Sequence, residues 1–521
     1  MKPRQLSIVF AVACALATSA SAAVKLPQVI SNNMVVQSGE PLAIWGWADA
    51  GEKVTIKQGG VVLASAEGLG NGRNDKPWRA QLPAQKPGPV ADIEIAGTTS
   101  VTLTNVLAGD VWLCSGQSNM VMAMSKKVGY GGVLNEDQEL AAASDPQLRF
   151  FQGGNWEICT PENAPHFSAV GYFFARKLRA EMKMPVGIMS LAAGGMAAEL
   201  FTPARMIDGD PDLLAQKSKA KEVHDAIGPR GDAYGKAYKE MKVKAAAAKL
   251  KGEKGPPPPV NQLTPAESKA FDDASLMLNS GSMYERVLRS VIPYNIKGFV
   301  WYQGEANGAR GDKYAHLMSK LIQGWREDWG KPAAPFIMVA LAGFGQPVVC
   351  DAKLSSFPLV REAMIKVAAT VPNTGVISAV DVGEPTNIHP HNKQPVGDRA
   401  ALWALNHVYG QQVVAEGPGF GKVTFAAGKA LVPLTTNKDG VVLKGPGGFE
   451  LAGADQKFIP AKAELKGASL EVTAPEVPTP VALRYAFLNF PECTVYNGAG
   501  IPAMPFRTDD WPVQPVAPVK R

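Results

Sequence analysis

The chain has 521 residues, of which 46% are hydrophobic and 19% are charged. This composition is typical of a folded, water-soluble protein and excludes a disordered or fibrous chain, and the length predicts two to four domains. The formal net charge is +6, and the basic residues are spread along the chain instead of forming a tract. We therefore expect neither a nucleic acid nor an anionic membrane surface as partner.

Residues 1–22 have the order of a secretory signal peptide. Lys2 and Arg4 precede an apolar stretch at 6–17, and the small residues Ala20-Ser21-Ala22 suit a cleavage site. The apolar stretch is too short to span a bilayer, and no later segment has about twenty uninterrupted apolar residues. We expect a periplasmic or secreted protein without membrane insertion.

Three regions follow with different patterns. Residues 23–107 contain short alternating runs such as PLAIWGWA and VTLTNV, separated by turn residues, and predict an all-β domain. Between 108 and 409, apolar runs such as VWLC, VGIMSL and TGVISAV alternate with helical stretches, which predicts an α/β domain with a parallel sheet flanked by helices. Alternating strands return at 410–521 and predict a second all-β domain.

The α/β region is interrupted at about 205–283. GDAYGKAYKEMKVKAAAAKLKGEK has helix formers and few large apolar residues, and the proline run in GPPPPVNQLTP is extended. We interpret this insertion as a solvated helical hairpin with a stiff spacer, in preference to an arm that grips substrate.

The motif VWLCSGQSNM at 111–120 leaves an apolar strand abruptly. Gly116 permits a tight turn, and a helix can begin after Ser118. Ser118 is therefore predicted at the carboxyl end of the sheet, the edge at which open α/β sheets bind ligands, with backbone N–H groups available to an oxyanion. The alternative is a serine that only caps a helix.

A serine nucleophile needs a base, usually a histidine. The candidates are His166, His224, His316, His389, His391 and His407. Most of them lie in or beside predicted helices or in the insertion, where we expect structural or surface roles. His389 differs, because it stands between Ile388 and Pro390 in a loop that follows an apolar strand ending at Asp381. This loop leaves the same edge of the sheet as Ser118.

His389 and His391 suggest a metal site as an alternative. Zinc requires three or four ligands at a recognisable spacing, and only Asp381 and Glu384 accompany the two histidines. We therefore expect no metal.

Two further strand ends offer groups for an oxyanion. Gln303 in WYQGEAN follows an apolar strand, and an amide donor at such a position contributes about 3 kcal/mol where it has been measured. Gly194 and Gly195 follow the strand in VGIMSLAAGGM, where a backbone N–H would join the same pocket. The alternative for both is an ordinary corner between strand and loop.

Together these motifs resemble the sialate O-acetylesterase family of the SGNH (GDSL-like) hydrolases. The blocks GQSNM, the glycine pair, WYQGEAN and DVGEPTNIHPHNK have the family's order and spacing. LPQVISNNMVVQ near the start, FSAVGYFFARKL and the closing VYNGAGIPAMPFRTDDW extend the resemblance to most of the chain outside the insertion. It implies an SGNH-type, flavodoxin-like sheet between the two β domains, and a carbohydrate O-acetylesterase without a cofactor.

The resemblance also implies residue roles. Ser118 matches the nucleophile and His389 the base, while Gly195 and Gln303, with the Ser118 N–H, match the oxyanion donors. The family's acidic position, three residues before the histidine, falls on Thr386 here. We choose Asp381 as the acid, with Glu384 or a Ser–His dyad oriented by a backbone carbonyl as alternatives.

The sugar is left open by these motifs. Acetylated sialic acid and acetylated plant cell-wall polysaccharides such as xyloglucan or xylan are both compatible with the resemblance. A neutral glycan would use an aromatic platform, for which Trp156, Trp301 and Tyr302 are candidates, although a core role is equally compatible. A noncatalytic carbohydrate-binding protein with an inert hydrolase-like domain is the alternative function. The pattern does not predict an oligomeric state.

Overall fold

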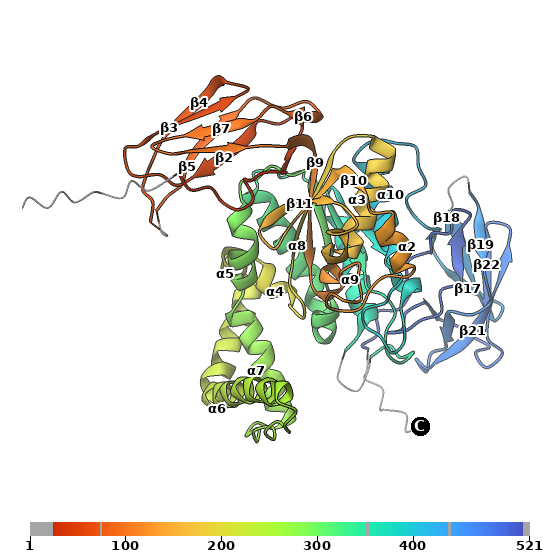
Figure 1. Cartoon of the computed structure of the whole chain (residues 1–521). Helices are drawn as coiled ribbons and strands as arrows, with labels where there is room; N and C mark the ends of the chain where they lie inside the picture. The colour runs from red at the N-terminus through yellow and green to blue at the C-terminus, as the bar shows by residue number, and fades with distance from the viewer. Residues whose placement is uncertain (1–23, 73–74, 351–354, 436–438, 514–521) are drawn as a thin grey trace, which may run out of the picture.

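The computed structural model describes residues 24–72, 75–350, 355–435 and 439–513 (Figure 1). The predicted signal peptide at 1–22 lies outside the described residues. Within the described ranges, no helix is both long and apolar enough to cross a membrane.

A largely parallel sheet forms the centre of the molecule (Figure 1). Its strands lie in the order β11 (Asn155–Cys159), β10 (Asp145–Gln152), β12 (Val186–Ala192), β9 (Val106–Gly116), β13 (Gly298–Tyr302), β14 (Phe336–Ala340) and β15 (Thr374–Ser378). All neighbours in this path pair in parallel except β10 and β11. When the edge hairpin of β10 and β11 is left out, the remaining strands lie in the order β12, β9, β13, β14 and β15. Numbered along the chain, this is the flavodoxin-like order 2-1-3-4-5. The predicted fold class is confirmed.

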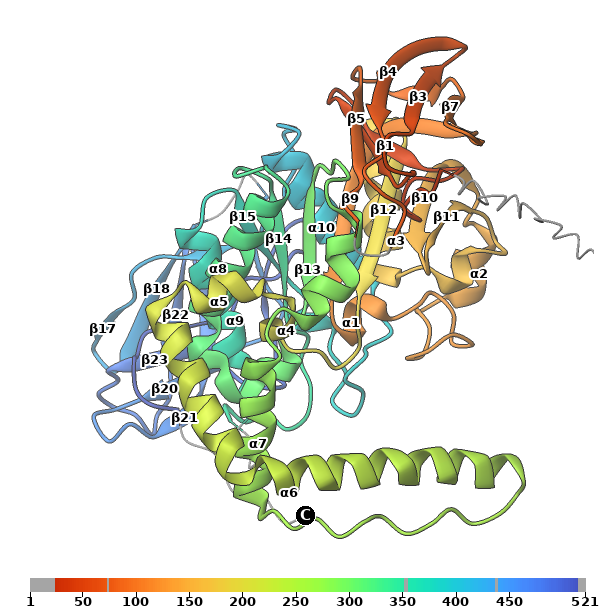
Figure 2. The ribbon, with the colours of Figure 1, turned by 90° about the vertical axis from the view of Figure 1, so that its left-hand side faces the viewer.

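Helices cover both faces of this sheet (Figure 2). α3 (Ala169–Met182) packs against α10 (Gln394–His407), and α8 (Gly311–Asp328) packs against α9 (Phe357–Thr370). Trp112 of β9 meets Phe174 of α3 edge-on, with ring centroids 5.1 Å apart. Phe299 pairs in register with Leu113, the neighbour of Trp112, and contacts Trp325 of α8. Because adjacent residues of a strand face opposite sides, α3 and α8 cover opposite faces.

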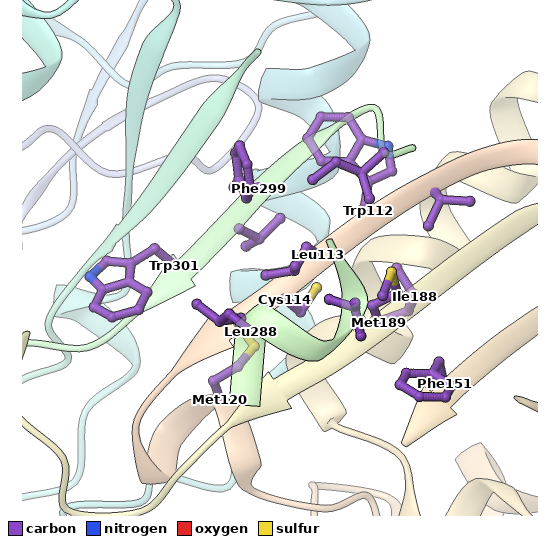
Figure 3. Close-up of a cluster of buried hydrophobic side chains, with 14 of the residues drawn as sticks. Trp112, Leu113, Cys114, Met120, Phe151, Ile188, Met189, Leu288, Phe299 and Trp301 are labelled. Atoms are coloured by element: carbon purple, nitrogen blue, oxygen red, sulfur yellow. The ribbon is translucent and has the colours of Figure 1, made fainter. Parts of the chain in front are cut away.

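The core of the α/β region is built from consecutive residues of its strands, because a sheet covered on both faces buries every position. Figure 3 shows side chains of β9, β12 and β13, among them Trp112, Leu113, Cys114, Ile188, Met189, Phe299 and Trp301. Cys114 is fully buried, and burial raises the pKa of its thiol.

The N-terminal strands form small antiparallel sheets above the central one (Figure 1). One sheet pairs β2 (Leu42–Gly46) with β5 (Trp78–Leu82). The other has the strand order β4 (Val61–Glu67), β3 (Lys53–Gln58), β7 (Ile93–Ala96) and β8 (Ser100–Leu103). β1 (Val35–Gln37) and β6 (Gly88–Val90) pair with the first half of β9, whose second half belongs to the central sheet. The predicted boundary at 107/108 therefore falls inside one continuous strand.

The C-terminal strands form a sheet with a hydrophobic core of its own. They are β16 (Gly419–Phe420), β17 (Thr424–Ala426), β18 (Lys429–Thr435), β20 (Phe449–Ala452), β21 (Phe458–Lys466), β22 (Ser469–Thr473), β23 (Ala482–Tyr485) and β25 (Phe506–Arg507). A separate pair is formed by β19 (Val441–Leu443) and β24 (Val495–Asn497).

The insertion forms two helices that project from the body (Figure 2). α6 (Pro211–Leu250) is bent in this view and has Pro229 in its interior, where proline removes a helical hydrogen bond. α7 (Pro265–Leu278) begins with a capping box between Thr264 and Glu267. The remaining short helices of the α/β region include α1 (Ser118–Val121), α2 (Glu136–Ala141), α4 (Ala198–Phe201) and α5 (Ala204–Asp208).

Candidate active site

The carboxyl end of β9 is held between its two neighbouring strands. Gly116 has a φ of +135°, and a Cβ at this position would overlap the carbonyl oxygen of Tyr302. The Gln117 N–H donates to that same oxygen at 2.9 Å, and the Ala193 N–H donates to the Gly116 oxygen at 3.0 Å. The chain reverses its winding direction at β9, and such a switch point is where open α/β sheets bind ligands.

Gln117 fixes the loop that follows β13. Its side chain is buried, and its Oε1 accepts hydrogen bonds from Gln303 Nε2 at 3.1 Å, Gly304 N at 3.3 Å and Ala306 N at 3.2 Å. One amide oxygen therefore links the end of β9 to the start of the loop in the WYQGEAN motif.

Ser118 lies at the first position of α1 and is 7% exposed. α1 is a single turn of four residues, so the predicted helix after the serine is short. Among the described residues, no hydrogen bond engages the Ser118 hydroxyl, and none joins it to His389. The N–H of Gly195, at the turn after β12, likewise has no acceptor in the described part of the chain.

The loops of Ser118 and His389 are joined through Asn119. Asn119 Nδ2 donates to the main-chain oxygen of Ile388 at 3.0 Å, and its Oδ1 accepts from Lys393 Nζ at 2.8 Å. Lys393 Nζ also donates to the oxygen of Pro390 at 2.8 Å. The main chain on both sides of His389 is therefore held by a network that starts at the residue after Ser118.

This network contains buried ionisable groups. Lys393 is 1% exposed, and burial lowers the pKa of its amine to about 7. Asn119 Nδ2 also donates to Glu305 Oε1 at 2.5 Å, and burial raises the pKa of that carboxyl. Glu305 Oε2 and the Tyr302 hydroxyl are buried polar atoms with no partner among the described residues.

His389 is partly exposed at this edge. Burial, and next the charge of Lys393, lower the pKa of its imidazole below the usual value, which favours the neutral form that a base requires. Asn387 brackets its main chain: Oδ1 accepts from the His389 N–H at 3.0 Å and Nδ2 donates to the His389 oxygen at 2.9 Å. The imidazole lies beside the ring of Tyr130, with centroids 4.5 Å apart and planes at 40°.

The choice of Asp381 as the acid is corrected by its contacts. Both carboxylate oxygens accept from the guanidinium of Arg399, at 2.7 and 2.8 Å, and the two side chains are 9% and 8% exposed. The alternative, Glu384, bonds to the neighbouring histidine, with Oε1 2.9 Å from His391 Nδ1. No carboxylate of the described residues contacts the His389 ring, which leaves the Ser–His dyad among the predicted alternatives.

The oxyanion role of Gln303 also needs correction. Gln303 is fully buried, and its Nε2 has three acceptors within the protein: Asn307 Oδ1 at 2.8 Å, Gln117 Oε1 at 3.1 Å and the Met196 oxygen at 3.2 Å. Because an amide has two N–H bonds, none is left for a reacting group. Gln303 instead anchors the loop that carries Gly195, through its bond to Met196.

The predicted aromatic platform is wrong, because all its members are core residues. Trp156 is 3% exposed and donates from Nε1 to the Val29 oxygen. Trp301 is fully buried and packs against Phe201 and Trp325, and Tyr302 is fully buried as well.

A metal-like cluster lies elsewhere in the described chain, at the start of α6. Ligand atoms of Asp210, Asp212 and His316 lie within 4.8 Å of one another. Lys320 Nζ is 3.0 Å from Asp210 Oδ2 and already supplies a positive charge there. This cluster shares no residue with the strand ends described above.

Sequence reasoning missed Tyr130, Asn119 and Lys393. Asn119 directly follows Ser118, and Lys393 comes four residues after His389, so their closeness to predicted site residues was the available signal. Tyr130 lies in GYGG, where only the flanking glycines suggest an unusual loop.

Comparisons with known proteins agree on one kind of enzyme. Residues 274–401 match the family model for carbohydrate esterase, sialic acid-specific acetylesterase. The chain is 27% identical to a sialate O-acetylesterase of Rattus norvegicus, over 92% of this chain and 93% of that protein, and 26% identical to that of Homo sapiens, over 94% and 93%. A crystal structure of a carbohydrate acetylesterase from Xanthomonas citri superposes with a TM-score of 0.73 at 29% identity, covering 94% of this chain and 100% of that one.

The fold and these matches define a carboxylic ester hydrolase that acts on carbohydrates. The matched region includes His389, whereas Ser118 lies in the part covered by the full-length relatives. Over most of its length the chain is similar to sialate O-acetylesterases, and the family model of these enzymes matches residues 274–401.

Proposed function

We propose that the protein removes O-acetyl groups from a carbohydrate through an acetyl-serine intermediate on Ser118, with His389 as the base. The observation that carries this proposal is the bond from Asn119 Nδ2 to the Ile388 oxygen, which brings the residue after Ser118 to the residue before His389. A nucleophile and a base on converging loops at a sheet's switch point are what acyl transfer requires.

The mechanism has two balanced halves. The Ser118 hydroxyl attacks the acetyl carbonyl as His389 takes its proton; the tetrahedral intermediate then collapses, and His389 returns the proton to the departing sugar oxygen. Water next attacks the acetyl-serine while His389 takes one of its protons. His389 then gives this proton to the Ser118 oxygen as the ester bond breaks, which restores the serine hydroxyl and releases acetic acid, which ionises to acetate. The backbone N–H groups of Ser118 and Gly195 donate to the oxyanion in both halves.

His389 acts as a base without a carboxylate partner in this proposal. The side chain of Asn387 holds the main chain of His389 through two hydrogen bonds, so the base is positioned by backbone hydrogen bonds. The absent Ser118–His389 hydrogen bond is compatible with this role, because such bonds commonly tighten only when substrate binds.

Removal of the nucleophile tests this proposal. Wild-type enzyme should hydrolyse p-nitrophenyl acetate, and Ser118→Ala and His389→Ala should both fall close to background. Ser144→Ala, at an exposed serine, is the matched control and should retain wild-type activity. Equal rates for wild type and Ser118→Ala would overturn the assignment and would favour the noncatalytic, carbohydrate-binding alternative.

The substrate and the location are the finer parts of the proposal. Acetate release from acetylated sialosides, xylan and xyloglucan would assign the sugar and would distinguish the sialate from the plant polysaccharide alternative. We also propose export to the periplasm or medium on the pattern of residues 1–22. N-terminal sequencing of the mature protein should begin at Ala23, and an intact Met1 would contradict export by cleavage.

A further inference from the structure

Tyr130 is the most exposed aromatic side chain in the part of the chain that the structure describes, at 42%. It lies in the segment between α1 and α2, between Gly129 and Gly131, both of which have positive φ. The other described aromatic residues are buried or partly buried, so Tyr130 is the aromatic ring whose surface is most open to a ligand.

The position of this ring is defined by two contacts. On one side it lies 4.5 Å from the imidazole of His389, measured between ring centroids. At its other end, the Tyr130 hydroxyl occupies the space where a Cβ on Gly194 would project. The side chain therefore extends from the loop of the proposed base to the turn that carries Gly195.

These two loops enclose the reacting acetyl group in the mechanism above. His389 gives its proton to the departing sugar oxygen, so the sugar must lie next to His389 when the ester bond breaks. A ring that flanks His389 and reaches the Gly194 turn is consequently in contact range of the sugar. The three aromatic residues that the sequence offered for this purpose are buried and cannot reach it.

We propose that Tyr130 forms the leaving-group subsite, with its ring packed against the apolar face of the sugar that carries the acetyl ester. A tyrosine suits this ligand class, because it combines a flat apolar surface with a hydroxyl that can pair with sugar hydroxyls. This inference rests on the proposed function, since it needs Ser118 and His389 to act on an acetylated sugar.

Two acetate esters separate a sugar subsite from a general role. Glucose pentaacetate has a sugar ring as its leaving group, and ethyl acetate has none; acetate release is measured for both. For Tyr130→Ala, kcat/KM on glucose pentaacetate should fall about tenfold or more through a higher KM, while kcat/KM on ethyl acetate stays within about threefold. Tyr130→Phe and Tyr130→Trp keep a ring and should retain most activity on both esters.

Leu134→Ala is the matched control, because Leu134 is 53% exposed in the same segment between α1 and α2. It should leave both esters unaffected. An equal loss on the two esters for Tyr130→Ala would show that the ring only positions His389, and unchanged kinetics on glucose pentaacetate would show that no sugar meets it. Either result overturns the subsite.

Failure of the underlying function gives a different pattern. If Ser118 were not the nucleophile, Ser118→Ala would keep its activity on both esters, whatever Tyr130→Ala does. If Ser118→Ala is inactive on both esters while Tyr130→Ala matches wild type, the esterase assignment stands and the subsite alone is rejected.

Discussion

Asn119 donates a hydrogen bond from Nδ2 to the main-chain oxygen of Ile388 at 3.0 Å, although the two residues are 269 positions apart in the chain. This bond joins the turn of Ser118 to the loop of His389. Removing it should misplace the base relative to the nucleophile. For Asn119→Ala we expect kcat to fall by about 10- to 100-fold, because small displacements of catalytic groups are costly.

Asn163→Ala is the control for the hydrogen bond alone. Asn163 Nδ2 also donates to a main-chain oxygen, that of Ile158 at 3.0 Å, away from the strand ends of the site. Both variants should lose about 1 kcal/mol or more of unfolding free energy, measured by urea denaturation. An Asn119→Ala enzyme with wild-type kcat would contradict the link between the loops.

Lys393 should make stability depend on pH. Burial lowers the pKa of its amine to about 7 in the folded protein, opposed by the charges of Glu305 and Glu384, whereas the unfolded chain keeps the usual value near 10.4. Between these values the unfolded state binds one more proton, so this residue adds stability as pH rises from about 7 to about 10. Lys393→Met should flatten that rise in the unfolding free energy. If the unfolding free energies of wild type and Lys393→Met differed by a constant amount across this pH range, the prediction would be contradicted.

His389 should set the acid limb of activity. Its pKa is lowered by burial and then by Lys393, and only the neutral imidazole can accept the serine proton. We expect kcat/KM to fall as pH drops through an apparent pKa below about 6.5, the ordinary histidine value. In Lys393→Met this limb should move to higher pH, because a neighbouring positive charge is gone. If the acid limb does not move in Lys393→Met, the charge of Lys393 does not influence the pKa of His389.

Asp381 should be important for folding and not for turnover. Its carboxylate pairs with Arg399 at two positions, and breaking a buried pair from one side costs about 3 to 5 kcal/mol. Asp381→Asn should therefore unfold at lower urea concentration, while kcat of the folded fraction stays within about threefold. Asp509→Asn, which breaks the buried pair with Arg484, is the matched control. A loss of orders of magnitude in kcat for Asp381→Asn alone would restore its role as the acid.

Gly194 and Tyr130 should be coupled. A methyl group at Gly194 would overlap the Tyr130 hydroxyl, so Gly194→Ala should displace the ring and lower kcat/KM on acetylated sugar. Tyr130→Phe removes the obstructing oxygen and should restore much of that loss in the double variant. A double-mutant cycle measures this coupling, expected at about 0.5 to 3 kcal/mol. Additive effects would show that the two residues do not meet.

The sheet and the placement of its strand ends followed from local patterns. Each strand and helix carries its own periodicity, and the carboxyl ends of parallel strands share one edge, so Ser118, Gly195, Gln303 and His389 were all expected there. Local patterns could not predict which residues these side chains contact. Lys393 meets Asn119 across 274 positions, and only the folded chain brings them together.

The errors have physical causes. An acid at a strand end looks the same in sequence whether it faces a histidine or, as Asp381 does, an arginine on the next helix. Trp301 and Tyr302 were considered for a platform, yet parallel strands covered on both faces bury every residue, which indicates a core role for aromatics in such a run. Tyr130 lies in a glycine-rich loop without periodicity, and loops of this kind carry function without a sequence pattern.

Labelling of the nucleophile tests the pairing of Ser118 with His389 most directly. The enzyme is treated with a serine-reactive fluorophosphonate, and the modified peptide is located by mass spectrometry. We predict a phosphonyl group on Ser118 in the wild type, no label in Ser118→Ala, and labelling of Ser118 slowed by orders of magnitude in His389→Ala. Label on another residue, or labelling of His389→Ala at the wild-type rate, would contradict the assignment of these two residues as nucleophile and base.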